Sequence, residues 1–460
     1  MLTSVFTRRR LAALLAGAAA LIASLPSQAV PAWARQTGKA CVACHFQHYP
    51  ALNDFGMDFK ASGYVDIKAK PLAGKDLSIA DTLYASLFSK IRWQKTNGSD
   101  GLNADGEKAK TTHSGELQFP DEFAILLGGR VGQHVGFMLE GQLAGDGAVL
   151  AGFKMPMMWP LGESGMKAGV VPFTTDALGA SYGFELFNTG AVRNVRISEH
   201  RAETSAQQYV FFQGTGPLGG ETNPVSGAQS RNTAGAATGF SFVLYNPLFF
   251  VVVAPHTPNH LAGAESQLGG LNATYFRAAV TPSFQGWSLG AGVQAWSGNN
   301  VRFNDGGAGV FSNDIATVQT KGWAIDAQAQ GNVGSMPLGL YLAHARAPGT
   351  AAGSATPNLF NANRNARTAT TLTAELGVLP QKATVVASFR RADNGANASS
   401  KDNALTLGAT YQVYQNLQLQ LMHSRRSDGS NGVGRYGPNY AAGGTVAGDA
   451  LTTFMLSVGY

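Results

Sequence analysis

The carboxyl-terminal residues alternate strictly between two kinds of position. Phe454, Leu456, Val458 and Tyr460 share one face, whereas Thr453, Met455, Ser457 and Gly459 share the other. Successive side chains of an extended strand point to opposite faces, so this pattern predicts a strand with one apolar face. Taken alone, it also fits an amphipathic edge strand of a soluble sheet.

The same alternation recurs upstream in pairs of segments joined by tight turns. The first turn, Gln415–Asn416, lies between the alternating apolar residues Leu405, Leu407, Ala409, Tyr411 and Val413 and the residues Leu417, Leu419 and Leu421. The second turn, Pro380–Gln381, lies between Leu372, Ala374, Leu376 and Val378 and the residues Val385, Ala387 and Phe389. The third turn, Tyr245–Pro247, lies between Phe240, Phe242 and Leu244 and the residues Phe249, Val251 and Val253. Each pair predicts an antiparallel hairpin.

Long polar connections separate these hairpins, at 424–449, 391–403 and 297–320. Short turns at one end and long loops at the other are typical of a transmembrane β-barrel, whose short turns face the periplasm. We count about 18 strands from Ile79 to Tyr460, or about 16 if weak segments near Val195 and Phe211 are merged differently. Both numbers are even, as a single-chain bacterial barrel requires.

Composition supports a barrel over a soluble domain. The chain has 57 glycines, 10% aromatic residues and 13% charged residues, where an ordinary soluble domain has about 25% charged residues. A barrel needs few charges because its outer face meets lipid and its lumen can be lined by Ser, Thr, Gln, Asn and Gly. The net charge of +6 is spread along the chain and predicts no nucleic-acid partner.

The amino terminus predicts export. Arg8–Arg10 precede an apolar run over 11–25, and a small-residue exit follows at Ala32-Trp33-Ala34. This order is that of a signal peptide, and the run is shorter than the roughly 20 residues of a spanning helix. We place the signal peptide at 1–34, with Ala29 as the alternative last residue.

Directly behind this signal stands Cys41-Val42-Ala43-Cys44-His45, which holds both cysteines of the chain. A CxxCH motif places two thiols on one helical turn for thioether bonds to haem, and its histidine binds the iron as an axial ligand. A zinc site needs further Cys or His ligands at matching spacing, and a redox CxxC pair needs an α/β domain around it. We therefore predict one covalent haem c on Cys41 and Cys44, with His45 as axial ligand.

The sixth iron ligand stays open at this point. Met57 is the candidate that we name, and it is equally a residue that packs against the porphyrin edge. His48 lies only three residues beyond His45 and is poorly placed for the opposite face of the haem. His113 and His134 are more distant alternatives.

The predicted haem segment covers 35–75, including a linker at 68–75 that leads to a barrel at 76–460. About 35 residues are too few to bury a core unaided. A wide barrel needs water or a plug in its lumen. We therefore predict an all-β transmembrane barrel of about 16–18 antiparallel strands, with a small, mostly helical or irregular haem c segment plugging its lumen.

The segment from Ala34 to Tyr64 resembles the fused monohaem cytochrome–porin family of the bacterial outer membrane. The likeness rests on the CVACH site, on Phe46-Gln47-His48-Tyr49-Pro50, and on Phe55-Gly56, Phe59-Lys60 and Gly63-Tyr64. A carboxyl-terminal strand that ends in an aromatic residue also resembles the assembly signal of outer-membrane barrels. The resemblance implies a conduit that oxidises extracellular iron(II) and passes electrons to a periplasmic c-type cytochrome or similar carrier.

Two other functions fit the same sequence. One is a porin whose haem segment is a plug or redox gate and whose main task is solute diffusion. The other is an electron conduit for a different donor, such as a reduced organic mediator. If the protein is an enzyme, it is an oxidoreductase acting on iron(II) with a cytochrome as acceptor. We find no HExxH motif, no P-loop and no convincing nucleophile elbow in the sequence.

Hard oxygen ligands suit iron(II), so acidic residues in the predicted loops are candidate contacts for it. They are Asp100, Asp105, Glu107, Asp305, Asp393 and Asp428. The alternative is that each is a solvated loop charge.

Overall fold

The structure is a computed structural model, and it describes the chain in a series of ranges. These are 31–66, 71–73, 78–80, 84–98, 115–143, 149–175, 182–190, 205–212, 234–260, 270–305, 311–396, 400–426 and 448–460. The predicted signal core at 11–25 lies outside them. Among the described residues, no helix is both long and apolar enough to cross a bilayer.

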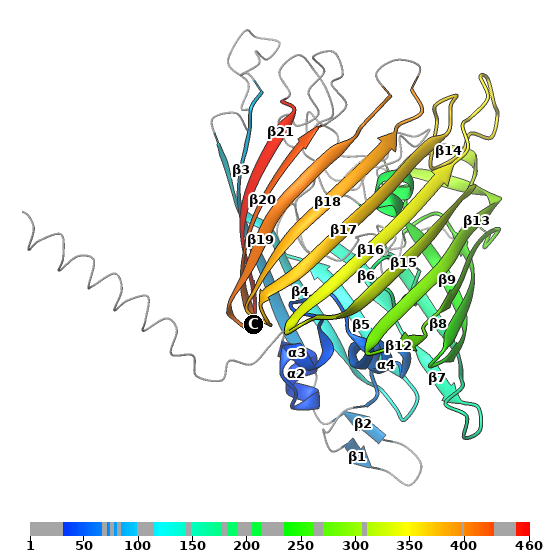
Figure 1. The fold of residues 1–460 in the computed structure, drawn as a ribbon. Helices are drawn as coiled ribbons and strands as arrows, with labels where there is room; N and C mark the ends of the chain where they lie inside the picture. Colours follow the sequence, from blue (N-terminus) through cyan, green and yellow to red (C-terminus); the bar gives the residue numbers. More distant parts are fainter. Residues whose placement is uncertain are drawn as a thin grey trace, which may run out of the picture.

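Antiparallel strands close into a barrel (Figure 1). Its strands are β3 (Tyr84–Thr96), β4 (Glu116–Arg130), β5 (Gly136–Gln142), β6 (Val149–Lys154), β7 (Met157–Pro160), β8 (Lys167–Thr175), β9 (Ala237–Asn246), β10 (Phe249–Thr257), β11 (Ala273–Val280), β12 (Ser283–Phe284), β13 (Trp287–Asp305), β14 (Phe311–Gln319), β15 (Gly322–Val333), β16 (Met336–Ala347), β17 (Arg367–Leu379), β18 (Ala383–Asp393), β19 (Ala404–Tyr414), β20 (Leu417–Arg426) and β21 (Ala450–Gly459).

Within the described ranges these strands fill sixteen positions around the ring. The pairs β6 and β7, β11 and β12, and β14 and β15 each share one position, because both members pair with the same neighbour. The last strand, β21, pairs with the first, β3, from Leu451↔Thr96 to Gly459↔Phe88. This pairing closes the barrel and confirms the smaller of the two predicted strand numbers.

The alternation read from the sequence matches the two faces of the wall. In β21, Phe454, Leu456 and Val458 face outward, whereas Thr453 and Ser457 are buried on the inner side. Large apolar side chains are exposed all round the outside, among them Phe240, Phe242, Val253, Phe276, Ile325, Leu340, Leu342, Leu372, Val385, Phe389, Leu405, Leu407 and Leu421. A continuous exposed apolar belt on a closed barrel is the surface that a lipid bilayer covers.

The three predicted hairpin turns are confirmed. They join β9 to β10, β17 to β18, and β19 to β20. All strand-to-strand turns of this kind lie at the end of the barrel where the carboxyl terminus lies (Figure 1). We call this the short-turn end.

Three details of the sequence prediction are wrong. Phe211 lies in a short π-helix, η3 (Gln208–Phe212), because its ring packs inside the barrel against Trp296 and Phe360. Most of the expected loop at 297–320 is strand, since residues 299–303 pair with β14 and only 306–310 separate the two strands in sequence. Val195, the other weak segment, lies outside the described residues.

The third difference concerns where the barrel begins. Ile79 lies in β2 (Ser78–Ala80), which pairs with β1 (Pro71–Ala73) as a separate two-stranded sheet. The first barrel strand, β3, starts at Tyr84. Neighbouring sequence alternation cannot distinguish these two sheets, because a short hairpin outside the barrel shows the same period of two.

Three short helices precede the barrel in sequence. They are α2 (Pro31–Thr37), α3 (Cys41–Cys44) and α4 (Asp54–Ala61). All three lie at the short-turn end (Figure 1). We call residues 31–64 the N-terminal segment.

Candidate functional site

The CxxCH motif forms a single helical turn, α3. Ala40 before it and His45 after it are both extended, and the His45 N–H donates to the Cys41 carbonyl at 2.9 Å. Residues three apart on a helix lie on the same side, so the two thiols share one face. Both cysteines are free thiols in the structure. The predicted attachment residues are therefore brought together as haem c chemistry requires.

His45 is oriented by a hydrogen bond to the backbone. Its Nδ1 lies 3.2 Å from the Ala51 carbonyl, and because a carbonyl only accepts, Nδ1 must donate. Burial lowers the pKa of His45 to about 4, despite that hydrogen bond, so the imidazole is neutral at neutral pH. Nε2 then keeps its lone pair for a metal, which is how an axial histidine is usually prepared. Two thiols and this imidazole fit a haem c.

A second helix is packed tightly against the motif. The Asn53 side chain caps α4 by accepting from the Gly56 N–H at 3.0 Å, and its amide donates to the carbonyls of Val42 and Ala43. A Cβ on Gly56 would lie 2.1 Å from the Cys44 carbonyl oxygen, so only glycine permits this approach. Asn53 and Gly56 thereby fix α4 against the attachment helix.

The attachment helix is also anchored to the barrel, at the β19–β20 turn. The Cys41 N–H donates to Gln415 Oε1 at 3.0 Å, and Cys41 Sγ lies 3.1 Å from the Gln415 carbonyl oxygen. Nearby, the Tyr49 hydroxyl donates to the Ser457 carbonyl at 3.2 Å. These contacts join residues about 370 to 410 positions apart, so no local sequence signal pointed to them.

His48 forms a buried ion pair with the barrel wall. Its Nε2 lies 2.6 Å from Glu375 Oε1, and both side chains have no exposed surface. Burial alone lowers the pKa of His48, but the carboxylate of Glu375 outweighs burial and the net pKa is raised. Since Nδ1 is held by the Tyr49 carbonyl at 2.7 Å, both ring nitrogens are engaged. His48 is thus a docking residue in this structure.

Further contacts of the N-terminal segment come from other sectors of the ring. Asn188 and Gln330 hydrogen-bond the Leu52 backbone, and Asp58 pairs with the Tyr245 hydroxyl. On the far side, Ala32 donates to Ser86 on β3 and Gln36 donates to the Gly128 carbonyl on β4. The segment therefore contacts inward-facing groups of β3, β4, β9, β15, β17 and β21.

Trp33 belongs to this packed segment. Its ring stacks on Tyr64 with centroids 4.8 Å apart and meets Phe59 edge-on at 5.5 Å. Cleavage after Ala34 would remove this ring, whereas cleavage after Ala29 would leave α2 whole. The place of cleavage stays a prediction.

The other candidate residues are less engaged with the site. Met57 is buried in an apolar cluster of the lumen, and its role as sixth ligand stays a prediction. His134 lies in the β4–β5 turn, where its carbonyl accepts from the Met158 N–H. His113 lies outside the described residues.

No iron site is visible in the described part of the chain, which contains no group of three His, Cys, Asp or Glu side chains arranged for a metal. Asp393 is the only proposed loop carboxylate whose side chain is described, and it pairs with Lys401 at 3.0 Å and Ser400 at 3.1 Å. The side chain of Asp305 is not described, and Asp100, Asp105, Glu107 and Asp428 lie outside the described residues. Iron binding by these carboxylates stays a prediction.

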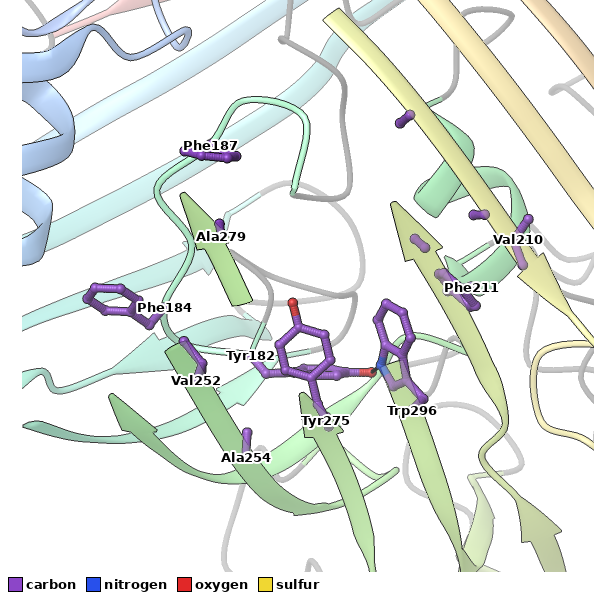
Figure 2. Packing of buried hydrophobic residues seen from close by; sticks show 14 of the residues in the cluster. Tyr182, Phe184, Phe187, Val210, Phe211, Val252, Ala254, Tyr275, Ala279 and Trp296 are labelled. Atoms are coloured by element: carbon purple, nitrogen blue, oxygen red, sulfur yellow. Dashed lines mark hydrogen bonds between the residues drawn. The ribbon is translucent and has the colours of Figure 1, made fainter. Parts of the chain in front are cut away.

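The sequence did not predict a dry region inside the barrel. Parts of the β8–β9 connection, at 182–190 and 205–212, lie in the lumen and pack on the wall strands (Figure 2). We call this the interior cluster; its large members are Tyr182, Phe184, Leu186, Phe187, Tyr209, Val210, Phe211, Phe250, Tyr275, Trp296 and Phe360. Figure 2 shows Tyr182, Tyr275 and Trp296 at its centre, and Tyr275 and Trp296 have ring centroids 4.9 Å apart.

A buried charge network ties this connection to the wall. Arg277 Nη1 lies 2.5 Å from Asp326 Oδ1, and Arg277 Nε lies 2.9 Å from Glu185 Oε2. Glu185 also accepts the N–H groups of Leu186 and Phe187. Breaking a buried pair by removing one partner typically costs about 3–5 kcal/mol, so residues 182–190 are firmly held in the lumen.

The opposite part of the lumen is polar. On β17 to β20, inward hydroxyls bond across strands, as in Thr373–Ser388 at 2.7 Å and Thr406–Ser424 at 2.8 Å. Gln412 is buried there, and neither end of its amide has a hydrogen-bond partner among the described residues. Buried polar groups without protein partners are normally satisfied by water. We call the inner face of β17–β21 the polar face.

Comparisons with known proteins agree with the barrel. No family model and no curated protein sequence matches the chain. Among solved structures, OmpT of Vibrio cholerae is 10% identical with a TM-score of 0.42, covering 85% of this chain and 100% of that one. An anion-selective porin from Comamonas acidovorans is 14% identical with a TM-score of 0.46, covering 82% and 99%. OmpF of Salmonella typhi, solved with daunomycin, is 10% identical with a TM-score of 0.41, covering 85% and 100%.

These likenesses are too distant to carry an argument, so the fold rests on the strand pairing of this chain. Fold and site together define a porin-like, closed, sixteen-strand barrel with a CxxCH segment at its short-turn end. The barrel agrees with the porin half of the resemblance seen in the sequence. The cytochrome half and the link to iron(II) oxidation stay predictions.

Proposed function

We propose that this protein is an outer-membrane porin with a haem-bearing gate. The exposed apolar belt would lie in the membrane, the short turns would face the periplasm, and the N-terminal segment would close the lumen from that side. The observation that carries the proposal is the ring of contacts between this segment and inward-facing groups around the wall. The polar face supports diffusion of a small polar solute.

Cys41 and Cys44 would hold one haem c by thioether bonds, and His45 would bind its iron. When bound, haem supplies a centre that gains or loses one electron. The chain's own part is to orient the His45 imidazole through Ala51, to hold Cys41 at Gln415, and to pack α4 against Cys44. The gate is thus fixed to the wall by the same residues that present the attachment site.

Conductance of single proteins in planar bilayers tests the gate. A His48→Leu, Tyr49→Phe variant removes two contacts to the wall and should open more often than the intact protein. Thr384→Val, on the same inner face, serves as the control, because its hydroxyl bonds Thr410 on the neighbouring strand of the wall. Equal conductance of all three proteins would show that the segment does not gate the lumen.

A second function is favoured by the position of the motif at the short-turn end. A protein acceptor in the periplasm would dock there, close to Cys44, which is partly exposed. We propose as the second candidate an electron conduit from extracellular iron(II), or another small donor, to a periplasmic c-type cytochrome or similar carrier. In that case the protein is an oxidoreductase acting on iron(II).

Stopped-flow spectra of the oxidised holoprotein mixed with iron(II) separate the two functions when set beside liposome conductance. Fast reduction without solute conductance supports the conduit. Conductance without reduction supports the gated porin. If the purified protein carries no covalent haem, both proposed functions are refuted, and only the barrel fold stands.

A further inference from the structure

Two lysines lie close enough for their charges to repel each other inside the barrel, where Tyr64 of the N-terminal segment faces Lys154 of β6. Lys60 lies in the last turn of α4, and Lys154 is the last residue of β6, pointing inward with 8% of its surface exposed. Lys154 Nζ lies 5.4 Å from the centroid of the Tyr64 ring. A Cβ on Gly63 would touch Pro156 and Met158, so the chain after α4 packs directly on this part of the wall.

Neither ammonium group has a hydrogen bond or ion pair with any residue in the described ranges. Burial, together with the positive charge of Lys154, lowers the pKa of Lys60 to about 8. Glu185 acts on Lys60 from a distance, but its carboxylate is bound by Arg277. The negative charge of Glu140 on β5 attracts Lys154. Lys60 is half-buried and Lys154 is buried. Removing such cations from water without a paired anion costs free energy, and a bound anion would offset that cost.

The covalent structure of haem indicates what that anion is. The two propionate carboxylates of haem stand on the edge of the porphyrin opposite its two thioether links. Cys41 is held at the β19–β20 turn, and β6 lies several strands away around the ring, through β21, β3, β4 and β5. Lys154 therefore lies five strand positions around the ring from the turn that holds the thiol. Met57 lies one turn before Lys60 on α4 and shares its face of that helix.

We propose that Lys60 and Lys154 form an anion site that binds the carboxylates of the haem. This inference rests on the proposed covalent haem. The same carboxylate chemistry would suit a small anion passing through the lumen, so the experiment below has one arm for each source. The site adds two charge-assisted contacts to the three residues of the CxxCH motif.

Spectroelectrochemical titration of the holoprotein tests the haem arm. Loss of a positive charge beside a carboxylate favours ferric over ferrous iron. Lys60→Gln with Lys154→Gln should shift the electron-exchange equilibrium with a reference couple about tenfold toward the oxidised protein, which is ~59 mV for one electron. Lys60→Arg with Lys154→Arg keeps both charges and should restore most of the potential.

Lys167→Gln is the matched control, because Lys167 Nζ lies 5.5 Å from the ring centroid of Tyr245 on a neighbouring strand. The haem reduction potential of the Lys167→Gln variant should equal that of the unaltered protein. Heat-modifiable migration on a gel reports whether each variant assembles. If the double variant fails to assemble, the single variant Lys154→Gln replaces it, and this variant should also have a lower haem potential than the unaltered protein.

The second arm measures bilayer conductance of the same variants in chloride and in acetate. A changed anion dependence with an unchanged potential would assign the lysines to a permeating anion and overturn the haem assignment. An unchanged potential with unchanged conductance would overturn the anion site altogether. Absence of haem stain from the unaltered protein would instead refute the proposed function, so the two failures are distinguishable.

Discussion

At the scale of single residues, the chain separates positions that meet lipid from positions that meet the lumen. Burial along β21 follows the period of two without interruption, with Leu456 half-exposed outside and Ser457 buried inside. Because the wall is one residue thick, adjacent residues face different media. In β21 a charged side chain would therefore face lipid at an even-numbered position and the lumen at an odd-numbered one.

Leu456→Arg should impair assembly more than Ser457→Arg. Charge on the lipid face costs roughly 2–4 kcal/mol at the bilayer midplane, whereas the arginine at 457 would enter the lumen. The yield of heat-modifiable protein in the outer-membrane fraction measures the difference. Similar yields would contradict the register of the last strand.

Cys41→Ala and Cys44→Ala should each abolish or cripple covalent haem attachment. Each removes one thioether, and Cys41→Ala also removes the thiol that meets the Gln415 carbonyl. Haem stain on a denaturing gel measures attachment, and the double variant, which has no cysteine, gives the background stain. Full-strength stain in the double variant would refute the haem assignment.

At the scale of elements, the attachment site depends on two short helices that neither propensity nor length would stabilise. α3 has four residues and α4 has eight, and isolated helices of this length are marginal in water. Their stability comes from the Asn53 cap, from the contact of Gly56 with Cys44, and from docking on the barrel. Changes at these contacts should therefore act on both helices together.

Gly56→Ala should displace α4 from α3, since its Cβ would lie 2.1 Å from a backbone oxygen. Overpacking of this kind costs about 1–3 kcal/mol. Haem content per barrel should fall, as measured by absorbance against protein. Gly132→Ala is the control, because a Cβ there meets nothing within 4 Å. Equal haem content in both variants would show that α4 is not required.

Docking of the N-terminal segment should weaken as pH rises. The pKa of His48 is raised above its ordinary value of 6.5 by Glu375, against the effect of burial. Its contribution is therefore complete below pH 6.5 and is lost as pH rises through the raised value. Limited proteolysis of the segment between pH 6 and pH 9 measures this loss.

Glu375→Gln removes the charge that raises the pKa of His48 and keeps the shape of the side chain. Its proteolysis should be faster than that of the unaltered protein at low pH and nearly independent of pH. A pH dependence that persists in this variant would assign the effect to another group.

At the scale of the whole molecule, the barrel interior is divided. The interior cluster fills one sector with aromatic side chains, and the polar face lines another. The N-terminal segment meets both at the short-turn end, through Leu52 and Ala51 respectively. A solute or donor from outside would therefore approach along the polar face.

Under the conduit function, free iron(II) should be oxidised much faster than bulky chelated iron, because a single haem near one mouth is reached only through the lumen. Rates in cells displaying the protein measure the contrast. A cross-link between outer loops should slow reduction of the haem and spare its oxidation from the periplasmic side. Equal rates for free and bulky donors would place the haem outside the lumen.

The local periodicity of the sequence determined the barrel class, the outer and inner faces of β21 and the three hairpin turns. These follow from side-chain alternation and turn chemistry, which depend on residues close in the chain. The CxxCH motif likewise fixed Cys41, Cys44 and His45 as a unit, since its chemistry needs only one helical turn and the residue after it.

Only the tertiary structure decided what lies inside the barrel. Glu375, Gln415 and Ser457 meet the N-terminal segment across more than 300 residues of chain, and nothing near them in sequence marks them as its partners. Phe211 reads as a strand residue because it is apolar, yet it lies in η3 because the lumen offers Trp296 and Phe360 to pack against. Period-two alternation places a side chain on the inner or outer face of a wall, but only closure of the wall determines which side chains meet across the lumen.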